Sequence, residues 1–219
     1  IAVATARSES SAERIIRAVR PDVAITSGGA MVRCGDEIVA ENLLGAEAAN
    51  AMVARFLATE GIGYITYRTY LGYFVNREFD RTDVSWQDYE NAQLVDLNQK
   101  IEHGLQKFVL EIPLNEARAI AADFPDAALI QYSGGDWVQF ACKTATKWNG
   151  VLAAAKHFGI ETGNIAAFGD DFNDVEMLEK CGIGVAMANA IPEAKAVANF
   201  VAASNDEDGV ARWLEENIL

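Results

Sequence analysis

The chain has 219 residues and a formal net charge of −14, which argues against a nucleic-acid partner. Hydrophobic residues make up 51% of the sequence and charged residues 23%, a composition typical of a globular protein rather than a disordered one. No apolar run approaches the length of a membrane span, so we expect no membrane partner. The three cysteines are widely spaced and form no C-x-x-C pair, which predicts reduced thiols in a cytoplasmic protein.

The N-terminal part of the chain alternates strands and helices. Apolar periodicity predicts a strand at 1–5, a helix at 10–19, a strand at 23–25 and a hairpin at 31–33 and 37–40. Pro21 ends the helix, and the paired glycines after Ser27 indicate a turn before the hairpin. Thr5 is therefore expected at the carboxyl end of a strand.

The composition changes at Gly45, where a segment with its own helices and hairpins begins. We predict helices at 46–59 and 115–122, and strands at 64–69, 73–76, 107–111, 128–132 and 137–142. The two successive glycines within 133–136 are a strong hairpin signal. Such elements form a sheet of their own, so we predict an α+β module at 45–138, inserted into a domain made of 1–44 and 139–219.

An alternating α/β pattern returns after this module. It predicts helices at 147–160, 192–198 and 209–217, a further helix starting at Val175, and strands at 165–168, 183–187 and 200–202. The fold class is therefore α/β, with a parallel-sheet core. Lys147 begins its helix at the positive end of the helix dipole, which is unfavourable unless an anion lies nearby. The alternative is an ordinary solvated lysine.

Carboxylates crowd the turn where the strand at 165–168 ends and the next helix starts. Asp170, Asp171 and Asp174 lie within this turn, together with Asn173. Ligands bind at the carboxyl ends of strands in open α/β sheets, and hard oxygen donors suit a cation such as Mg²⁺ that also contacts a phosphate. The alternative is that Asp171 or Asn173 caps the helix and the other acids are solvated.

Three sequence motifs, taken together with the distances between them along the chain, resemble those of a known family. They are G-D-D-F-N-D-V-E-M-L at 169–178, V-A-T-A-R at 3–7, and the lysine at position 147. Together they resemble the haloacid dehalogenase superfamily, specifically its Cof-type class IIB phosphatases. The resemblance spans essentially the whole chain and implies a Rossmann-like parallel-sheet core whose inserted module is a class IIB cap. Three places depart from the family pattern: Ala6 replaces a glycine, W-N-G at 148–150 replaces the small residues after the lysine, and Gly28 replaces an asparagine.

The resemblance implies a Mg²⁺-dependent phosphatase that acts on a small phosphorylated metabolite, such as a sugar phosphate, with the cap selecting the substrate. An aspartate nucleophile would form an aspartyl-phosphate that water then hydrolyses. The family's site residues map onto three overlapping groups in this sequence. The catalytic group is Thr5, Lys147, Asp170 and Asp174; the substrate-binding group is Thr5, Ala6, Arg7, Lys147 and Asn173; the metal ligands are Asp170, Asn173 and Asp174.

The family's D-x-D-G-T motif, which supplies the nucleophile and the acid/base, does not occur in these 219 residues. In the resembled fold this motif follows a central strand that precedes the strand at 1–5. We therefore expect that Ile1 is not the natural N-terminus and that an upstream segment carries the nucleophile. Two alternatives stay open: a pseudo-phosphatase that binds phosphate and metal without turnover, and a phosphotransferase that resembles phosphomannomutase.

Overall fold

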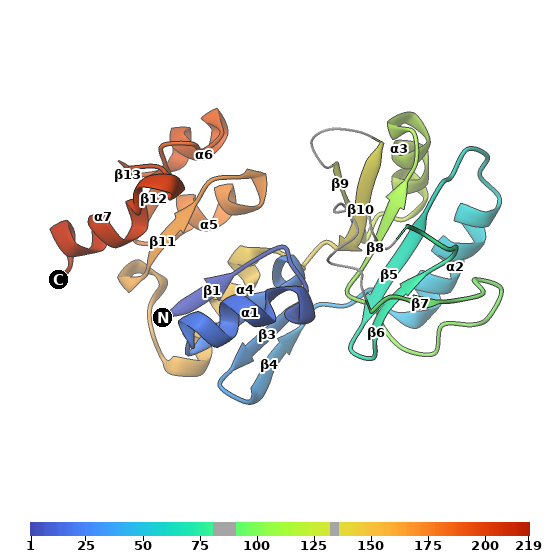
Figure 1. Cartoon of the computed structure of the whole chain (residues 1–219), viewed down its shortest axis with the longest axis horizontal. Coiled ribbons are helices and arrows are strands. Elements are labelled where there is room, and N and C mark those ends of the chain that lie inside the picture. Colours follow the sequence, from blue (N-terminus) through green and yellow to red (C-terminus); the bar gives the residue numbers. More distant parts are fainter. Residues whose placement is uncertain (81–90, 132–135) are drawn as a thin grey trace. The chain divides into compact units, whose positions relative to one another are not determined.

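The protein folds into two compact units, as a computed structural model of the chain shows (Figure 1). The structure describes residues 1–80, 91–131 and 136–219. The core unit comprises Ile1–Glu41 and Thr146–Leu219, and the cap unit comprises Asn42–Ala145. In the described ranges, no helix is both long and apolar enough to cross a membrane.

The N-terminal segment of the core unit forms a four-stranded sheet of order β1-β2-β3-β4. Its elements are β1 (Ala2–Ala4), α1 (Glu9–Val19), β2 (Val23–Thr26), β3 (Met31–Cys34) and β4 (Glu37–Glu41). The first two strands are parallel, and the hairpin strands pair in antiparallel fashion. Ser8 caps α1 by accepting a hydrogen bond from the Ser11 amide. This element order agrees with the prediction.

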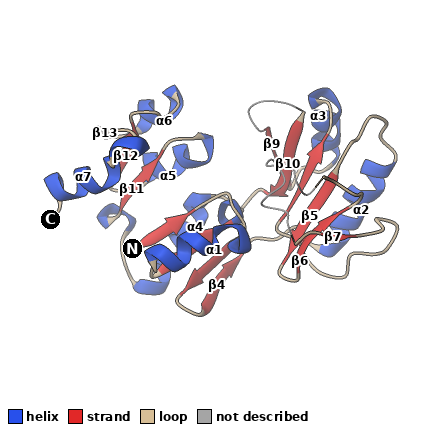
Figure 2. Cartoon of the chain, in the orientation of Figure 1, coloured by secondary structure: helices blue, strands red, loops and turns tan. Residues whose placement is uncertain are grey.

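The C-terminal segment of the core unit forms a second, fully parallel sheet of order β11-β12-β13. Its strands are β11 (Ala166–Gly169), β12 (Ile183–Met187) and β13 (Phe200–Ala202). Its helices are α4 (Lys147–Phe158), α5 (Val175–Lys180), α6 (Pro192–Val197) and α7 (Gly209–Asn217). The alternation of helix and strand is the predicted α/β pattern (Figure 2).

A single hydrophobic cluster joins both sheets of the core unit through α4. Ile25 of β2, Val151 of α4 and Val185 of β12 are all buried in it. Helix α4 lies close to β2, because a Cβ atom at Gly150 would be 2.5 Å from a methyl carbon of Ile25. Glycine at this position therefore allows close packing of the helix on the sheet.

The two sheets leave an apolar groove between β1 and β11. Each of these strands is the last in its sheet, and among the described residues neither has a partner on its outer edge. A cavity of about 560 Å³ lies there, lined by Ala2 of β1, Ala166 of β11 and apolar side chains of α4. Unpaired strand edges beside an apolar groove are a template for a further strand.

The cap unit is built on a six-stranded sheet of order β7-β6-β5-β8-β10-β9. The strands are β5 (Ile65–Thr69), β6 (Gly72–Val75), β7 (Gln93–Leu94), β8 (Lys107–Glu111), β9 (Ala127–Gln131) and β10 (Trp137–Cys142). The short strand β7 was not predicted from the sequence, and most of the hairpin turn predicted at 133–136 lies outside the described residues. The strands on either side of that turn, β9 and β10, pair in antiparallel fashion.

The limits of the cap unit differ from the predicted range of 45–138. Strand β10 pairs with β8 and β9 along its whole length, so a boundary at 138 would cut through the cap sheet. The chain instead leaves this sheet after Cys142, and the core unit resumes at Thr146. The predicted boundary is corrected accordingly, from 138 to 145 at one end and from 45 to 42 at the other.

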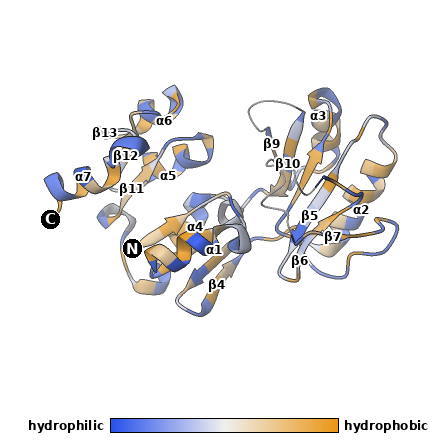
Figure 3. Cartoon of the chain, in the orientation of Figure 1, coloured by the Kyte–Doolittle hydropathy of each residue, from blue (hydrophilic) through white to orange (hydrophobic). Residues whose placement is uncertain are grey.

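One face of the cap sheet is covered by α2 (Ala46–Leu57) and α3 (Leu114–Asp123) (Figure 2). Hydrophobic and hydrophilic residues alternate along α2 in Figure 3, and its hydrophobic side is buried. Phe56 of α2 packs against Phe108 of β8 with the ring centres 5.1 Å apart. This face therefore forms the hydrophobic core of the cap unit.

Candidate active site

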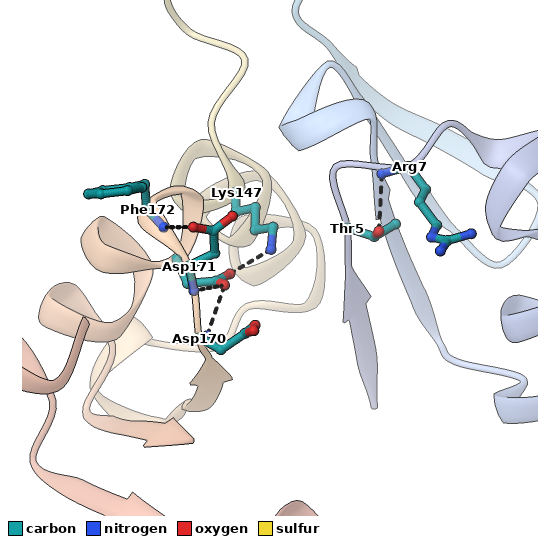
Figure 4. Close-up of polar contacts among 7 residues, drawn as sticks. Thr5, Arg7, Lys147, Asp170, Asp171 and Phe172 are labelled. Carbon is teal, nitrogen blue, oxygen red and sulfur yellow. Dashed lines mark hydrogen bonds and ion pairs between the residues drawn. The ribbon is translucent and has the colours of Figure 1, made fainter. Parts of the chain in front are cut away.

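Lys147 and Asp174 form a buried ion pair in the core unit (Figure 4). Lys147 Nζ lies 2.6 Å from Asp174 Oδ1, and the two side chains are 11% and 4% exposed. Thr146 caps α4 by accepting a hydrogen bond from the Asn149 amide, which fixes the first turn that carries the lysine. Lys147 is therefore not a solvated surface lysine. The anion that offsets its position at the helix N-terminus is the carboxylate of Asp174.

Asp174 also holds the turn after β11. Its second oxygen, Oδ2, accepts hydrogen bonds from the amides of Asp170 and Asp171, at 3.1 and 3.2 Å. Gly169 makes room for this carboxylate, because a Cβ atom there would lie 2.4 Å from Asp174 Cβ. Both carboxylate oxygens of Asp174 are therefore bonded to protein groups, which suits a residue that positions Lys147 and the turn.

The two remaining acids of the turn differ in their contacts. Asp171 accepts a hydrogen bond from the Phe172 amide and forms a reciprocal capping box with Asp174. It therefore plays the capping role considered in the sequence analysis. Asp170 is exposed, and its carboxylate makes no hydrogen bond or ion pair with the part of the chain that the structure describes. Its backbone carbonyl accepts a hydrogen bond from the Ile191 amide at 3.0 Å, so the residue itself is held in place.

Asp170 has the chemistry of a ligand for a hard divalent cation. Its carboxylate lies at the end of β11 next to the Lys147–Asp174 pair, and Asn173 follows in the same turn. Within the described ranges, no three acidic, histidine or cysteine side chains cluster closely enough to hold a metal by themselves. The residues present thus fit part of a Mg²⁺ shell, and substrate oxygens or water usually complete such a shell.

Thr5 lies at the carboxyl end of β1, as predicted. Its hydroxyl oxygen accepts a hydrogen bond from the Arg7 amide at 3.1 Å, and its own amide donates to the Ile25 carbonyl. The Gly28 amide donates to the Thr5 carbonyl, which ties this loop to the turn after β2. Ala6 lies within the loop, and the Arg7 side chain is exposed. The loop is therefore a fixed structure that presents a hydroxyl group.

The turn after β2 connects both parts of the site, a feature that sequence reasoning did not identify. Gly29 has a φ of +104°, and a Cβ atom there would lie 2.0 Å from the carbonyl oxygen of Thr146. This turn therefore contacts the loop of Thr5 on one side and the start of α4 on the other. The signal available in the sequence was the pair of glycines, which indicated a turn but not its contact with a helix more than a hundred residues away.

Comparison with known proteins identifies the family. Residues 1–214 match the model of the haloacid dehalogenase-like hydrolases, so the chain belongs to this family and the predicted resemblance is confirmed. The structure is similar to that of a subclass IIB sugar phosphatase of the superfamily, with a TM-score of 0.83. The two are 23% identical, and the match covers 99% of this chain and 84% of that one. This likeness establishes the fold, which is the predicted α/β core with a class IIB cap.

Curated relatives match shorter segments at higher identity. The chain is 49% identical over 67 residues to 5-amino-6-(5-phospho-D-ribitylamino)uracil phosphatase YitU of Bacillus subtilis. It is 42% identical over 77 residues to pyridoxal phosphate phosphatase YbhA of Escherichia coli. These matches cover 31% and 35% of this chain, and 25% and 26% of the two relatives. The matched segment thus spans about a quarter of each relative's own length.

Proposed function

We propose that this protein is a Mg²⁺-dependent phosphatase of small phosphorylated metabolites, such as sugar phosphates. The observation that carries the proposal is the buried Lys147–Asp174 pair, adjacent to the unengaged carboxylate of Asp170. A fixed cation beside a carboxylate suited to a divalent ion is the arrangement that phosphoryl transfer requires, because the phosphate and its attacking group are both negative. Named phosphatases among the relatives support the same reaction class.

Each residue of the site has a role in this proposal. Lys147 binds a phosphate oxygen, while Asp174 holds its ammonium group and the amides of the turn. Thr5 donates its hydroxyl proton to another phosphate oxygen, and the amides of Ala6 and Arg7 lie in the same loop. Asp170 and Asn173 would hold Mg²⁺, which neutralises charge on the phosphate. That Asp174 also binds the metal directly stays a prediction, although its contacts favour the positioning role.

The nucleophile is proposed to come from a strand that fills the groove between β1 and β11. The unpaired edges of both strands and the apolar lining of the groove support this placement. An aspartate at the end of such a strand would attack phosphorus, and the ester oxygen would leave with a proton from an acid. Water would then hydrolyse the aspartyl-phosphate, releasing inorganic phosphate and restoring the carboxylate. The three free cysteines support the further proposal of a cytoplasmic location.

The test uses the protein translated from the complete natural reading frame. We expect it to release phosphate from sugar phosphates with Mg²⁺ and to be inactive with a chelator. Asp170→Asn is expected to abolish Mg²⁺ binding measured by calorimetry, whereas Asp171→Asn, which alters the neighbouring capping residue, retains it. Metal and phosphate binding without turnover would favour the pseudo-phosphatase, and transfer between sugar phosphates would favour the phosphotransferase.

The cap unit, residues 42–145, is proposed to select the substrate. It is one continuous segment with its own sheet and hydrophobic core, so it can vary without changing the residues of the core site. Exchanging this segment for the cap of another class IIB enzyme is expected to change which phosphate esters are cleaved. An unchanged substrate profile would show that specificity lies in the core unit.

A further inference from the structure

The turn that joins β2 to β3 in the core unit has an uncommon backbone conformation. Four residues, 27–30, connect the two strands, and three of them in succession have a positive φ. The values are +51° at Ser27, +72° at Gly28 and +104° at Gly29. Hairpin loops of four residues are most often built around a type I turn, whose central residues have a negative φ. Joining the two strands therefore does not require this conformation, which a buried serine adopts at a cost.

One side of this turn is bonded to the loop that carries Thr5. The amide of Ser27 donates a hydrogen bond to the Arg7 carbonyl at 2.7 Å, and the amide of Gly28 donates to the Thr5 carbonyl at 2.9 Å. Within the loop, the Arg7 amide donates to the hydroxyl oxygen of Thr5 at 3.1 Å. Because the turn holds the main chain on which the hydroxyl is carried, the position of the hydroxyl depends on the position of the turn.

The other side of the turn abuts the start of α4. A Cβ atom at Gly29 would lie 2.0, 2.4 and 2.9 Å from the carbonyl oxygen, carbonyl carbon and amide nitrogen of Thr146. These are all main-chain atoms, so rotation of a side chain could not relieve the overlap. The Thr146 carbonyl also accepts a hydrogen bond from the Gly150 amide at 3.0 Å, which is part of the first turn of the helix. The turn thus contacts the helical turn from which Lys147 projects.

We propose that residues 27–29 are a positioning element, which sets the separation between the Thr5 hydroxyl and the Lys147 ammonium so that both bind one phosphate. This inference rests on the proposed function, in which the two groups bind different oxygens of the same phosphate. In Figure 4 the amino group of Lys147 extends toward the side of the site on which Thr5 lies. Two donors share a phosphate only if both reach it at once, and a displacement of about 1 Å can lower the rate about 100-fold. Gly29 is then required for this spacing.

The substitution Gly29→Ala in the full-length protein tests the proposal. The added methyl group forces the main chains of the turn and of α4 apart. We expect kcat for sugar phosphates to fall about 10- to 100-fold. Binding of inorganic phosphate, measured by calorimetry, should weaken by about 10-fold, as expected for loss of a hydrogen bond to a charged group.

The matched control is Gly35→Ala, in the turn between β3 and β4. Gly35 also has a positive φ, of +56°, but a Cβ atom there meets nothing within 4 Å. This variant therefore carries the backbone strain of a left-handed alanine without pushing on α4. It should keep the wild-type kcat and phosphate affinity. Wild-type values in Gly29→Ala, or equal losses in the two variants, would overturn the proposal.

A double-mutant cycle separates positioning from a general loss of stability. In a Thr5→Ala background no hydroxyl remains to be misplaced, so Gly29→Ala should lower kcat and phosphate affinity far less than in the wild type. A merely structural defect would lower both quantities by the same factor in the two backgrounds. Equal factors would therefore refute the positioning role.

Hydrogen exchange of the wild-type protein keeps the proposal testable if Gly29→Ala fails to fold. A phosphate held from both sides should slow exchange at the amides of Ser27 and Gly28, whose acceptors belong to the neighbouring loop. The amide of Gly35, in the next turn, should exchange at an unchanged rate. Unchanged exchange at all three amides would overturn the proposal.

The outcomes distinguish this inference from the proposed function. Phosphate binding that depends on Gly29, without turnover by the wild type, would refute the phosphatase and retain the positioning element. Turnover together with equal effects of Gly29→Ala in both backgrounds would do the reverse. Wild-type protein that binds no phosphate would overturn both.

Discussion

The core and cap units each bury a lysine, and the two lysines differ in the charged neighbour that the described residues give them. Lys147 of the core unit lies 2.6 Å from the carboxylate of Asp174. Lys107 of the cap unit donates to the neutral Gln139 and is paired in register with the cation Arg68. The protein thus neutralises the first charge with its own carboxylate and places the second beside a like charge. The first arrangement fixes the geometry of an ion pair, and the second sets two like charges side by side in the sheet.

The largest effect is expected on catalysis, when Lys147, the lysine paired with Asp174, is replaced. In the full-length protein, Lys147→Met should lower kcat about 100- to 1000-fold, as does removal of a single group that stabilises transition-state charge. Steady-state phosphate release measures this, and Lys143→Met, which alters an exposed lysine nearby, is the matched control. A larger loss in the Lys143 variant would show that the core site is assigned to the wrong lysine.

The second prediction concerns Lys107, whose replacement is expected to increase the stability of the protein. Lys107→Met should raise the free energy of unfolding by about 1–4 kcal/mol at pH 7, because it removes a buried charge that faces Arg68. Chemical denaturation measures the change. A marked loss of stability would mean that the lysine holds the cap sheet together.

The gain in stability expected for Lys107→Met depends on pH. The pKa of Lys107 is lowered from 10.5 to about 7 on folding, so between these values the unfolded state binds the extra proton. Wild-type stability therefore rises with pH across this window, and the advantage of Lys107→Met shrinks toward pH 10. Among described residues, the charged or titratable groups on the same sheet face are Arg68, Tyr73 and Glu111.

A smaller effect tests how the core unit positions its charge pair. Gly169→Ala should cost about 1–3 kcal/mol, because the added methyl group overlaps Asp174 and the side chain must move. It should also lower kcat, since Lys147 depends on that carboxylate. Gly163→Ala is the matched control, because a Cβ atom there meets nothing within 4 Å. Equal thermal unfolding of the two variants would contradict the tight packing at Gly169.

The smallest effect is expected for an exposed lysine that is also paired. Lys180 lies 2.6 Å from Glu176, one helical turn away on α5, and both side chains are more than 40% exposed. Lys180→Ala should change stability by no more than about 0.5 kcal/mol, because water and salt screen such pairs. A change as large as that at Lys107 would show that burial does not determine how much these lysines affect stability.

Local patterns in the sequence were sufficient for most of the fold. Predicted and observed limits agree within a few residues for the strands and helices, because apolar periodicity, Pro21 and the glycine turns are local signals. The predicted cap range ended at 138, inside the predicted strand at 137–142, whereas the cap unit ends at Ala145. Only the pairing of β10 with β8 and β9 assigns this strand to the cap unit.

The candidate site was predictable as a set of residues but not as a set of contacts. Motif spacing predicted that Thr5, Lys147 and the acidic turn belong to the site. It did not indicate that Lys147 and Asp174 pair with each other, because that contact joins residues far apart in sequence. The burial of Lys107 could not be predicted from the sequence either. A lysine at the start of a strand has no local signal for its cross-strand neighbour, and only the strand register shows that this neighbour is Arg68.

The division of the core unit between the two ends of the chain has a consequence for biosynthesis. On the ribosome, Ile25 and Gly29 emerge well before Gly150 and Thr146, against which they pack. The cap unit is continuous, so it completes its contacts while the second core segment is still being made. Domains fold as units during synthesis, and contacts between distant residues form late. The apolar surface of the nascent N-terminal sheet therefore stays exposed until the second core segment has been made, and such exposed surface is prone to aggregation.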